Sequence, residues 1–168
     1  MIVGAIGAML LMAAWRDLAS RLIPNAIPLT IAAVSVIGRL FDGPMAAAAS
    51  FAVAVGLLLL LMLVHARGLL GGGDVKLIAA IACGLSFPGL WNFIVTTALA
   101  GGLLGIAHFA LRAVLAGAPP RKPAGRGASL LARVYAAERW RIGRRGPLPY
   151  AVAIAFGGIW TLGASFGR

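Results

Sequence analysis

Two aspartates, Asp17 and Asp74, are the residues of this sequence best suited to carry out chemistry together. The chain has only four acidic residues among 168, and each of these two adjoins a long apolar stretch. An ionisable side chain at such a place costs free energy, which points to a function. Two neighbouring carboxyl groups do not both ionise readily and can share one proton at neutral pH. The ionised carboxyl can then accept a proton from water while the protonated one polarises a peptide carbonyl, which is the chemistry of aspartic proteolysis.

The remaining residues of catalytic type fit structural roles. Asp42 lies in a Phe-Asp-Gly-Pro turn, where aspartate commonly bonds the backbone. Glu138 lies among arginines and is interpreted as their surface charge partner. His65 and His108 are far apart in the sequence, and Cys83 is the single cysteine. The sequence therefore predicts no disulfide, no metal site and no cofactor.

The composition indicates the setting in which Asp17 and Asp74 must work. Hydrophobic residues make up 61% of the chain, charged residues 11%, and the mean hydropathy is +0.98. Soluble domains are nearer half apolar and a quarter charged, so this composition is typical of an integral membrane protein. The net charge of +11 is then explained by topology and by anionic membrane lipid as a partner, and we predict no nucleic-acid partner.

A membrane helix needs about 20 largely apolar residues. Proline and glycine break the apolar sequence at several places where a helix can end. The predicted fold is therefore all-α, a single membrane-embedded domain over residues 1–168 with about six transmembrane helices. The predicted spans are 2–21, 26–41, 45–64, 75–90, 92–115 and 147–166.

The positive residues predict the orientation of these spans. All of the 15 lysines and arginines except Arg39 and Arg168 fall on one side of a six-span arrangement. That side is expected to be cytoplasmic, with both termini outside. Asp17 and Asp74 then both lie at the cytoplasmic face. A basic loop at about 117–146 is expected on the same side, and its second half is predicted to form an amphipathic helix on the inner leaflet.

Three glycines directly precede the second aspartate. Gly71, Gly72 and Gly73 are predicted to permit unusual backbone angles and to let a substrate backbone approach closely. With Asp74 and Lys76 they resemble the GxGD(x)K signature of type IV prepilin peptidases, which are aspartic proteases of the membrane. In this resemblance Lys76 either offsets the charge of the aspartate or marks the cytoplasmic edge.

Two further sequence elements carry the same resemblance, in the order that the family has them. Asp17 precedes an Ile-Pro-Asn turn that contains Pro24 and Asn25, and Pro149 and Tyr150 precede the last predicted span. The resemblance implies that Asp17 and Asp74 are catalytic. It further implies a supporting loop of Gly71–Gly73 with Lys76, and a structural or substrate-side role for these Pro, Asn and Tyr residues.

The resemblance also implies an activity and a location. The chain is similar to the compact, peptidase-only form of tight-adherence (Flp-type) pilus systems, because it lacks the paired cysteines of longer members. Such an enzyme removes the short leader of prepilin or pseudopilin-like proteins, after a small residue, at the cytoplasmic face of the inner membrane. Its partners would be these substrates and the pilus assembly machinery.

Three other functions stay open on the sequence alone. The first is an archaeal-type preflagellin peptidase. The second is a small membrane transporter or channel in which Asp17 and Asp74 serve as ion relay sites. The third is a purely structural membrane subunit. Substitution of the aspartates distinguishes proteolysis from ion relay, because a protease pair is expected to lose all cleavage.

Overall fold

In the computed structural model, the described residues are 2–115, 131–132, 134, 136 and 148–166. Over these residues the chain is all-α and contains no strand, which confirms the predicted fold class. The predicted basic loop at 117–146 and its helix lie outside the described part, apart from the four isolated residues of that region. The six helices whose bounds the structure gives are α1 (Ile2–Ser20), α2 (Ala26–Leu40), α3 (Pro44–Ala66), α4 (Gly72–Ala82), α5 (Phe87–Leu115) and α7 (Tyr150–Phe166).

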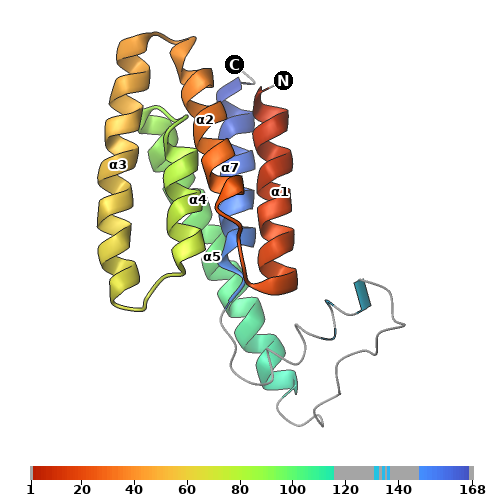
Figure 1. The fold of residues 1–168 in the computed structure, drawn as a ribbon. Helices are drawn as coiled ribbons and strands as arrows, with labels where there is room; N and C mark the ends of the chain where they lie inside the picture. The colour runs from red at the N-terminus through yellow and green to blue at the C-terminus, as the bar shows by residue number, and fades with distance from the viewer. Residues whose placement is uncertain (1, 116–130, 133, 135, 137–147, 167–168) are drawn as a thin grey trace.

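The helices run alternately up and down the bundle (Figure 1). The start of α1 and the end of α7 lie together at one end, and the connections 21–25 and 67–71 lie at the other, which we call the loop end. Asp17 is in the last turn of α1 and Asp74 in the first turn of α4, so both belong to the loop end.

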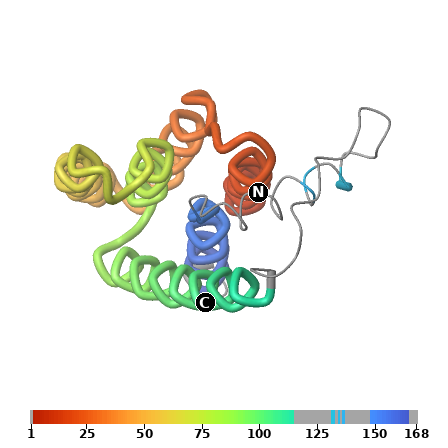
Figure 2. The backbone as a smooth tube through the Cα atoms, turned by 90° about the horizontal axis from the view of Figure 1, so that it is seen from below, coloured from red at the N-terminus to blue at the C-terminus, as the bar shows by residue number. Residues whose placement is uncertain are grey.

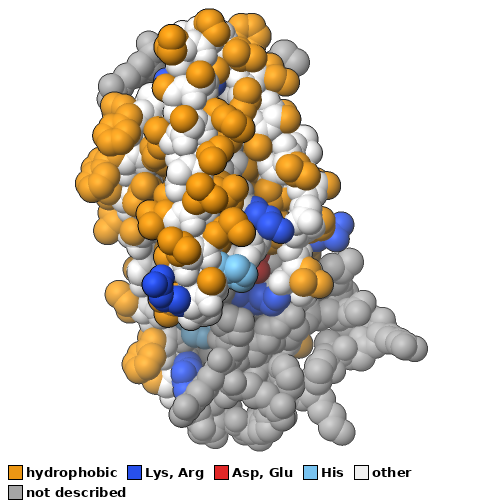
Figure 3. Space-filling view, turned by 60° about the vertical axis from the view of Figure 1, so that its left-hand side comes forward, with side chains coloured by type: hydrophobic (Ala, Val, Ile, Leu, Met, Phe, Trp, Pro, Cys, Tyr) orange, Lys and Arg blue, Asp and Glu red, His pale blue; other side chains and the backbone are white. Residues whose placement is uncertain are grey.

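Among the described residues, three helices are long and apolar enough to cross a membrane: α1, α3 and α5. Helices α2 and α7 are shorter apolar helices, so the structure supports a membrane protein but not a particular number of spans. On the face drawn in Figure 3, hydrophobic side chains cover the helices along their length, and most of the visible Lys, Arg, His and acidic side chains gather toward the lower part. This separation suits a bundle with apolar sides and one polar end.

The predicted boundary between the fourth and fifth spans is wrong. Helix α4 ends at Ala82 instead of near residue 90, and α5 already begins at Phe87. The Ser86 hydroxyl accepts a hydrogen bond from the Gly89 N–H at 3.3 Å, which is the pattern of a helix N-cap. Pro88 is tolerated there because a backbone N–H in the first turn of a helix has no hydrogen-bond acceptor within that helix, so its absence in proline costs nothing.

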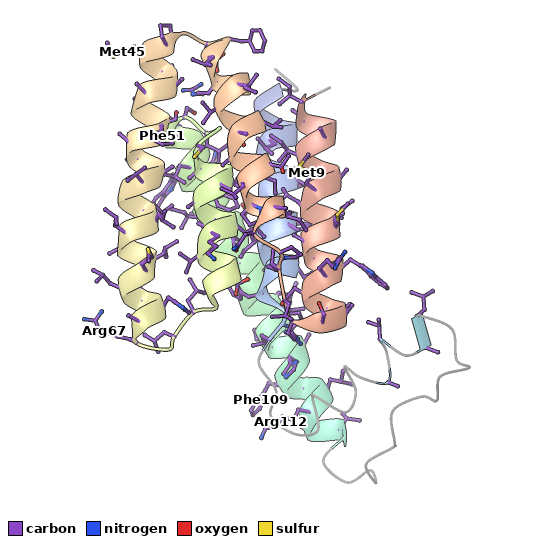
Figure 4. The ribbon with its side chains drawn as sticks, viewed as in Figure 1. Met9, Met45, Phe51, Arg67, Phe109 and Arg112 are labelled. Carbon is purple, nitrogen blue, oxygen red and sulfur yellow. The ribbon has the colours of Figure 1, made fainter. Side chains whose placement is uncertain are left out.

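Helix α5 is consequently longer than the bilayer core requires. Its 29 residues span about 43 Å at 1.5 Å per residue, against a hydrocarbon thickness of about 30 Å. Phe109 and Arg112 lie on the part of α5 that extends beyond the ends of the other helices (Figure 4).

Helix α7 packs against both helices that carry the aspartates, α1 and α4. It packs mainly against α5 and α1, and also against α4; viewed from the loop end, it lies inside the ring formed by the other helices (Figure 2). A Cβ atom at Gly158 would lie 2.8 Å from Leu10 of α1, 3.3 Å from Ile81 of α4 and 3.8 Å from Phe93 of α5. A small residue at this point therefore allows three helices to meet around α7, as is common where membrane helices pack closely.

Candidate active site

Asp17 is held at the very end of α1. Asp17 is 9% exposed, although its side chain is ionisable and lies at the polar end of the bundle. The helix stops because Arg21 adopts a left-handed backbone conformation, with φ of 58°. The Arg21 N–H still donates to the Asp17 carbonyl at 2.9 Å, which closes the last turn. The chain can then reverse direction through Pro24, which cannot continue a helix.

Asp74 is the third residue of α4, and Gly71 is the N-cap. An acidic side chain at this position commonly turns back toward the N-cap, where the helix dipole favours negative charge. The Asp74 carboxyl adopts this arrangement: a Cβ atom at Gly71 would lie 2.8 Å from Asp74 Oδ2. The absence of a side chain at Gly71 therefore leaves the space that the Asp74 carboxyl occupies.

The electrostatics of the site link Asp74 to the end of α1. Asp74 directly precedes the predicted span 75–90, and α4 is not among the helices suited to cross a membrane. Burial in the protein, and after it the negative charge of Asp17, raise the pKa of the Asp74 carboxyl to about 6, while the positive charge of Arg21 opposes this rise. The charges of Asp17 and Arg21 thus lie near enough to influence Asp74, although α2 and α3 separate them from Asp74 in the sequence.

Arg21 is a site residue that sequence reasoning missed, because it was counted only as a cytoplasmic charge. Its Nε and Nη1 atoms are buried in the protein, and its charge acts on Asp74. A left-handed backbone is uncommon for a residue other than glycine and costs about 1–3 kcal/mol. The signal available in the sequence was its position, between Asp17 and the Ile-Pro-Asn turn.

Lys76 and Asn25 join the two segments directly. Lys76 Nζ donates a hydrogen bond to Asn25 Oδ1 at 2.9 Å. Asn25 is the N-cap of α2, yet its side chain does not bond its own helix. The amide that would normally cap α2 thus ties the turn after Asp17 to the turn that contains Asp74. Lys76 therefore makes a specific contact in addition to contributing a positive charge at this end of the bundle.

The explanation predicted for the glycine run is wrong in one respect. Gly71 has a φ of −69°, Gly72 and Gly73 begin α4, and none of the three is among the positive-φ residues. The glycines instead permit close packing. A Cβ atom at Gly73 would lie 3.2 Å from the side chain of Ile23, so α4 begins in contact with the turn after α1.

The other predicted residues lie in packing positions. A Cβ atom at Gly101 of α5 would lie 2.6 Å from the ring of Tyr150, so this tyrosine packs across α5. Pro149 is buried beside it at the start of α7. The exposed Pro24 accepts a hydrogen bond from the Ile27 N–H at 3.1 Å and so helps to form the turn before α2.

An apolar cavity lies next to Lys76 and Asn25. It has a volume of about 440 Å³ and is bounded by α2, α3 and α4. Small residues, including Ala54, Ala80 and Cys83, form part of its wall, and Lys76 and Asn25 are its polar members. An apolar group could therefore bind beside the loop end of α4.

No group of three or more His, Cys, Asp or Glu side chains that could hold a metal ion occurs in the part of the chain that the structure describes. Asp42 lies apart from Asp17 and Asp74, in the turn between α2 and α3. There it forms an ion pair with Arg39 at 2.6 Å. It is therefore a suitable reference residue for experiments on the other two aspartates.

The electrostatic link predicts a titration that can be measured. Carbodiimides modify protonated carboxyl groups, so labelling of Asp74 is expected to fall as the pH rises through about 6. Asp17→Asn removes a charge that raises the pKa and should move the midpoint to lower pH. Arg21→Gln removes an opposing charge and should move it to higher pH. Mass spectrometry of the labelled peptide gives the midpoint for each protein, and equal midpoints in all three proteins would show that the groups do not interact.

Comparison with known proteins gives a family match. The model of the type IV leader peptidase family matches residues 4–106, which include both aspartates, the Ile-Pro-Asn turn and the glycine run. No match was found among curated proteins or among solved structures. The matched part covers more than half of the chain and ends within α5, before the helix α7. The chain therefore belongs to the type IV leader peptidase family and is a membrane peptidase.

Proposed function

We propose that this chain is a membrane aspartic endopeptidase that removes the short N-terminal leader of prepilin or pseudopilin-like proteins, with Asp17 and Asp74 as the catalytic pair. The observation that carries the proposal is that Asp17 and Asp74 lie at the same end of the bundle, where the charges of Asp17 and Arg21 act on the pKa of Asp74. Membership of the leader peptidase family supports the reaction class.

The pair acts with one shared proton. The ionised carboxylate accepts a proton from water as the water oxygen attacks the peptide carbonyl carbon, and the other carboxyl group gives its proton to the carbonyl oxygen. In the second step the carboxyl that gained a proton delivers it to the amide nitrogen, and the carbon–nitrogen bond breaks. A hydroxyl proton of the tetrahedral intermediate returns to the other carboxyl, so both carboxyl groups recover their starting protonation states. The positive charge of Arg21 favours ionisation of Asp74, which suits a pair that carries one proton.

The substrate would approach within the membrane. A leader followed by an apolar helix places the cut at the cytoplasmic face, where the positive residues predict that the aspartates lie. The apolar cavity beside Lys76 supports a substrate that is apolar on one side of the cut. The proposed location is the cytoplasmic (inner) membrane, with both termini outside. Anionic lipid at the basic loop and the pilus assembly machinery are proposed as further partners.

Family membership favours proteolysis over ion relay, since a relay needs no leader peptidase sequence. A preflagellin peptidase and a prepilin peptidase are distinguished only by which of the two substrates the enzyme cleaves.

The test is reconstitution of the purified chain in liposomes with three substrates. These are a prepilin, a preflagellin, and the prepilin with a bulky residue in place of the small residue before the cut. We expect the mass of the first to fall by its leader and the third to stay intact. Intact prepilin in the presence of the folded enzyme would refute the proposal, and faster cleavage of the preflagellin would reassign the substrate.

A further inference from the structure

His65, in the last turn of α3, contacts the segment that leads to Asp74. Its Nδ1 atom lies 2.7 Å from the carbonyl oxygen of Leu70. Because a carbonyl only accepts hydrogen bonds, Nδ1 carries the proton and donates it to Leu70. The bond joins the end of α3 to the residue immediately before the glycine run.

The same imidazole ring also lies against the glycine run. A Cβ atom at Gly72 would lie 3.3 Å from both Cε1 and Nε2 of His65. His65 therefore touches Leu70 and Gly72, the two neighbours of Gly71. Gly71 is the residue over which the Asp74 carboxyl folds.

The glycine run needs such a contact. Glycine loses more conformational freedom on folding than any other residue, and Gly71–Gly73 have no side chains with which to anchor themselves. On one side the run meets Ile23, and Lys76 bonds Asn25 one turn further on. His65 supplies the contact on the side of α3.

We propose that His65 is a positioning residue, which holds Leu70–Gly73 so that the Asp74 carboxyl stays in place beside Asp17. This inference rests on the proposed function for its effect on cleavage. His65 acts through the backbone of the segment, and no contact between its ring and either aspartate is required.

Three variants separate this role from others. His65→Ala removes both contacts, whereas His65→Asn keeps an amide nitrogen near the place of Nδ1 and can still donate to Leu70. His108→Ala, in α5, replaces the other histidine of the chain and is the matched control. In the reconstituted cleavage assay His65→Ala should lower kcat by roughly 10- to 100-fold, as expected for a catalytic group displaced by about 1 Å. KM should change little, and His65→Asn should recover most of kcat.

A second measurement does not depend on cleavage. Release of the segment exposes Asp74 to water, so His65→Ala should move the midpoint of carbodiimide labelling of Asp74 from about pH 6 toward lower pH. His65→Asn removes the same imidazole but keeps the anchor, and its midpoint should stay near that of the wild type. Thermal unfolding in detergent checks that each variant is folded.

The outcomes are distinct. Normal kcat in His65→Ala, or equal losses in His65→Ala and His65→Asn, would overturn the positioning role while leaving the proposed function intact. If the wild type cleaves no leader, the proposed function fails, and the labelling midpoints still decide whether His65 holds the segment.

Discussion

Asp17→Asn and Asp74→Asn are each expected to abolish leader cleavage. Asparagine keeps the size of the side chain but can neither accept the proton of water nor give one to the carbonyl oxygen. General acid–base catalysis contributes roughly 10²–10⁴-fold for each group, so kcat should fall by at least that factor. The measurement is the mass of a prepilin after incubation with each variant in liposomes.

Asp42→Asn is the control for this experiment. Asp42 is the third aspartate of the chain, and its ion pair with Arg39 lies at the opposite end of the bundle. Cleavage by this variant should equal that of the wild type. Measurable turnover by either Asp17→Asn or Asp74→Asn would show that the two carboxyl groups do not form the catalytic pair.

Gly71→Ala is expected to cause a loss of cleavage without a loss of folding. The backbone of Gly71 is at φ −69°, which alanine adopts easily. The new methyl group would lie 2.8 Å from Asp74 Oδ2, so the carboxyl must turn away. A displacement of about 1 Å at a catalytic group can reduce the rate by roughly 10²-fold, and we expect a decrease in kcat of this size.

Gly102→Ala provides the comparison, because a Cβ atom at that position in α5 meets nothing within 4 Å. Both variants should insert and unfold like the wild type, and only Gly71→Ala should cleave slowly. A Gly71→Ala enzyme of normal activity would mean that the Asp74 carboxyl has another productive position. Glycine at the N-cap of α4 would then not be needed to leave room for that carboxyl.

Helix α7, which packs against both helices that carry the aspartates, lies outside the part matched by the family model. The match ends at residue 106, whereas α7 begins at Tyr150. Gly158 of α7 nevertheless lies where α1, α4 and α5 meet. The spacing of α1 and α4 therefore depends on α7 as well as on α2, since both helices pack against α1 and α4.

The sequence by itself determined the fold class and the reaction class. In a membrane, the backbone N–H and C=O groups of long apolar stretches broken by proline and glycine find hydrogen-bond partners when the stretches form helices. The all-α prediction therefore followed from composition and spacing. The alternation of helices, together with the placement of positive residues, predicted that Asp17 and Asp74 share one end, and the structure has both there. Their catalytic role remains a prediction, since it depends on chemistry that only the substitutions test.

The tertiary structure decided the contacts within that end. Hydrophobic patterning does not specify which side chains meet across different helices. The Lys76–Asn25 hydrogen bond, the contact of His65 with Leu70 and the burial of the Arg21 Nε and Nη1 atoms therefore could not be predicted from it. The boundary between α4 and α5 was missed for a related reason. The residues on both sides of Cys83–Ser86 are apolar, so hydropathy does not show where one helix ends and the next begins. The hydrogen bond that makes Ser86 an N-cap, and so marks the start of α5, forms only in the folded chain. The glycines were identified from the sequence, but their role in the structure is steric. Gly71 leaves room for the Asp74 carboxyl of its own helix, whereas Gly72 and Gly73 leave room for His65 and Ile23, which come near only once the helices have packed.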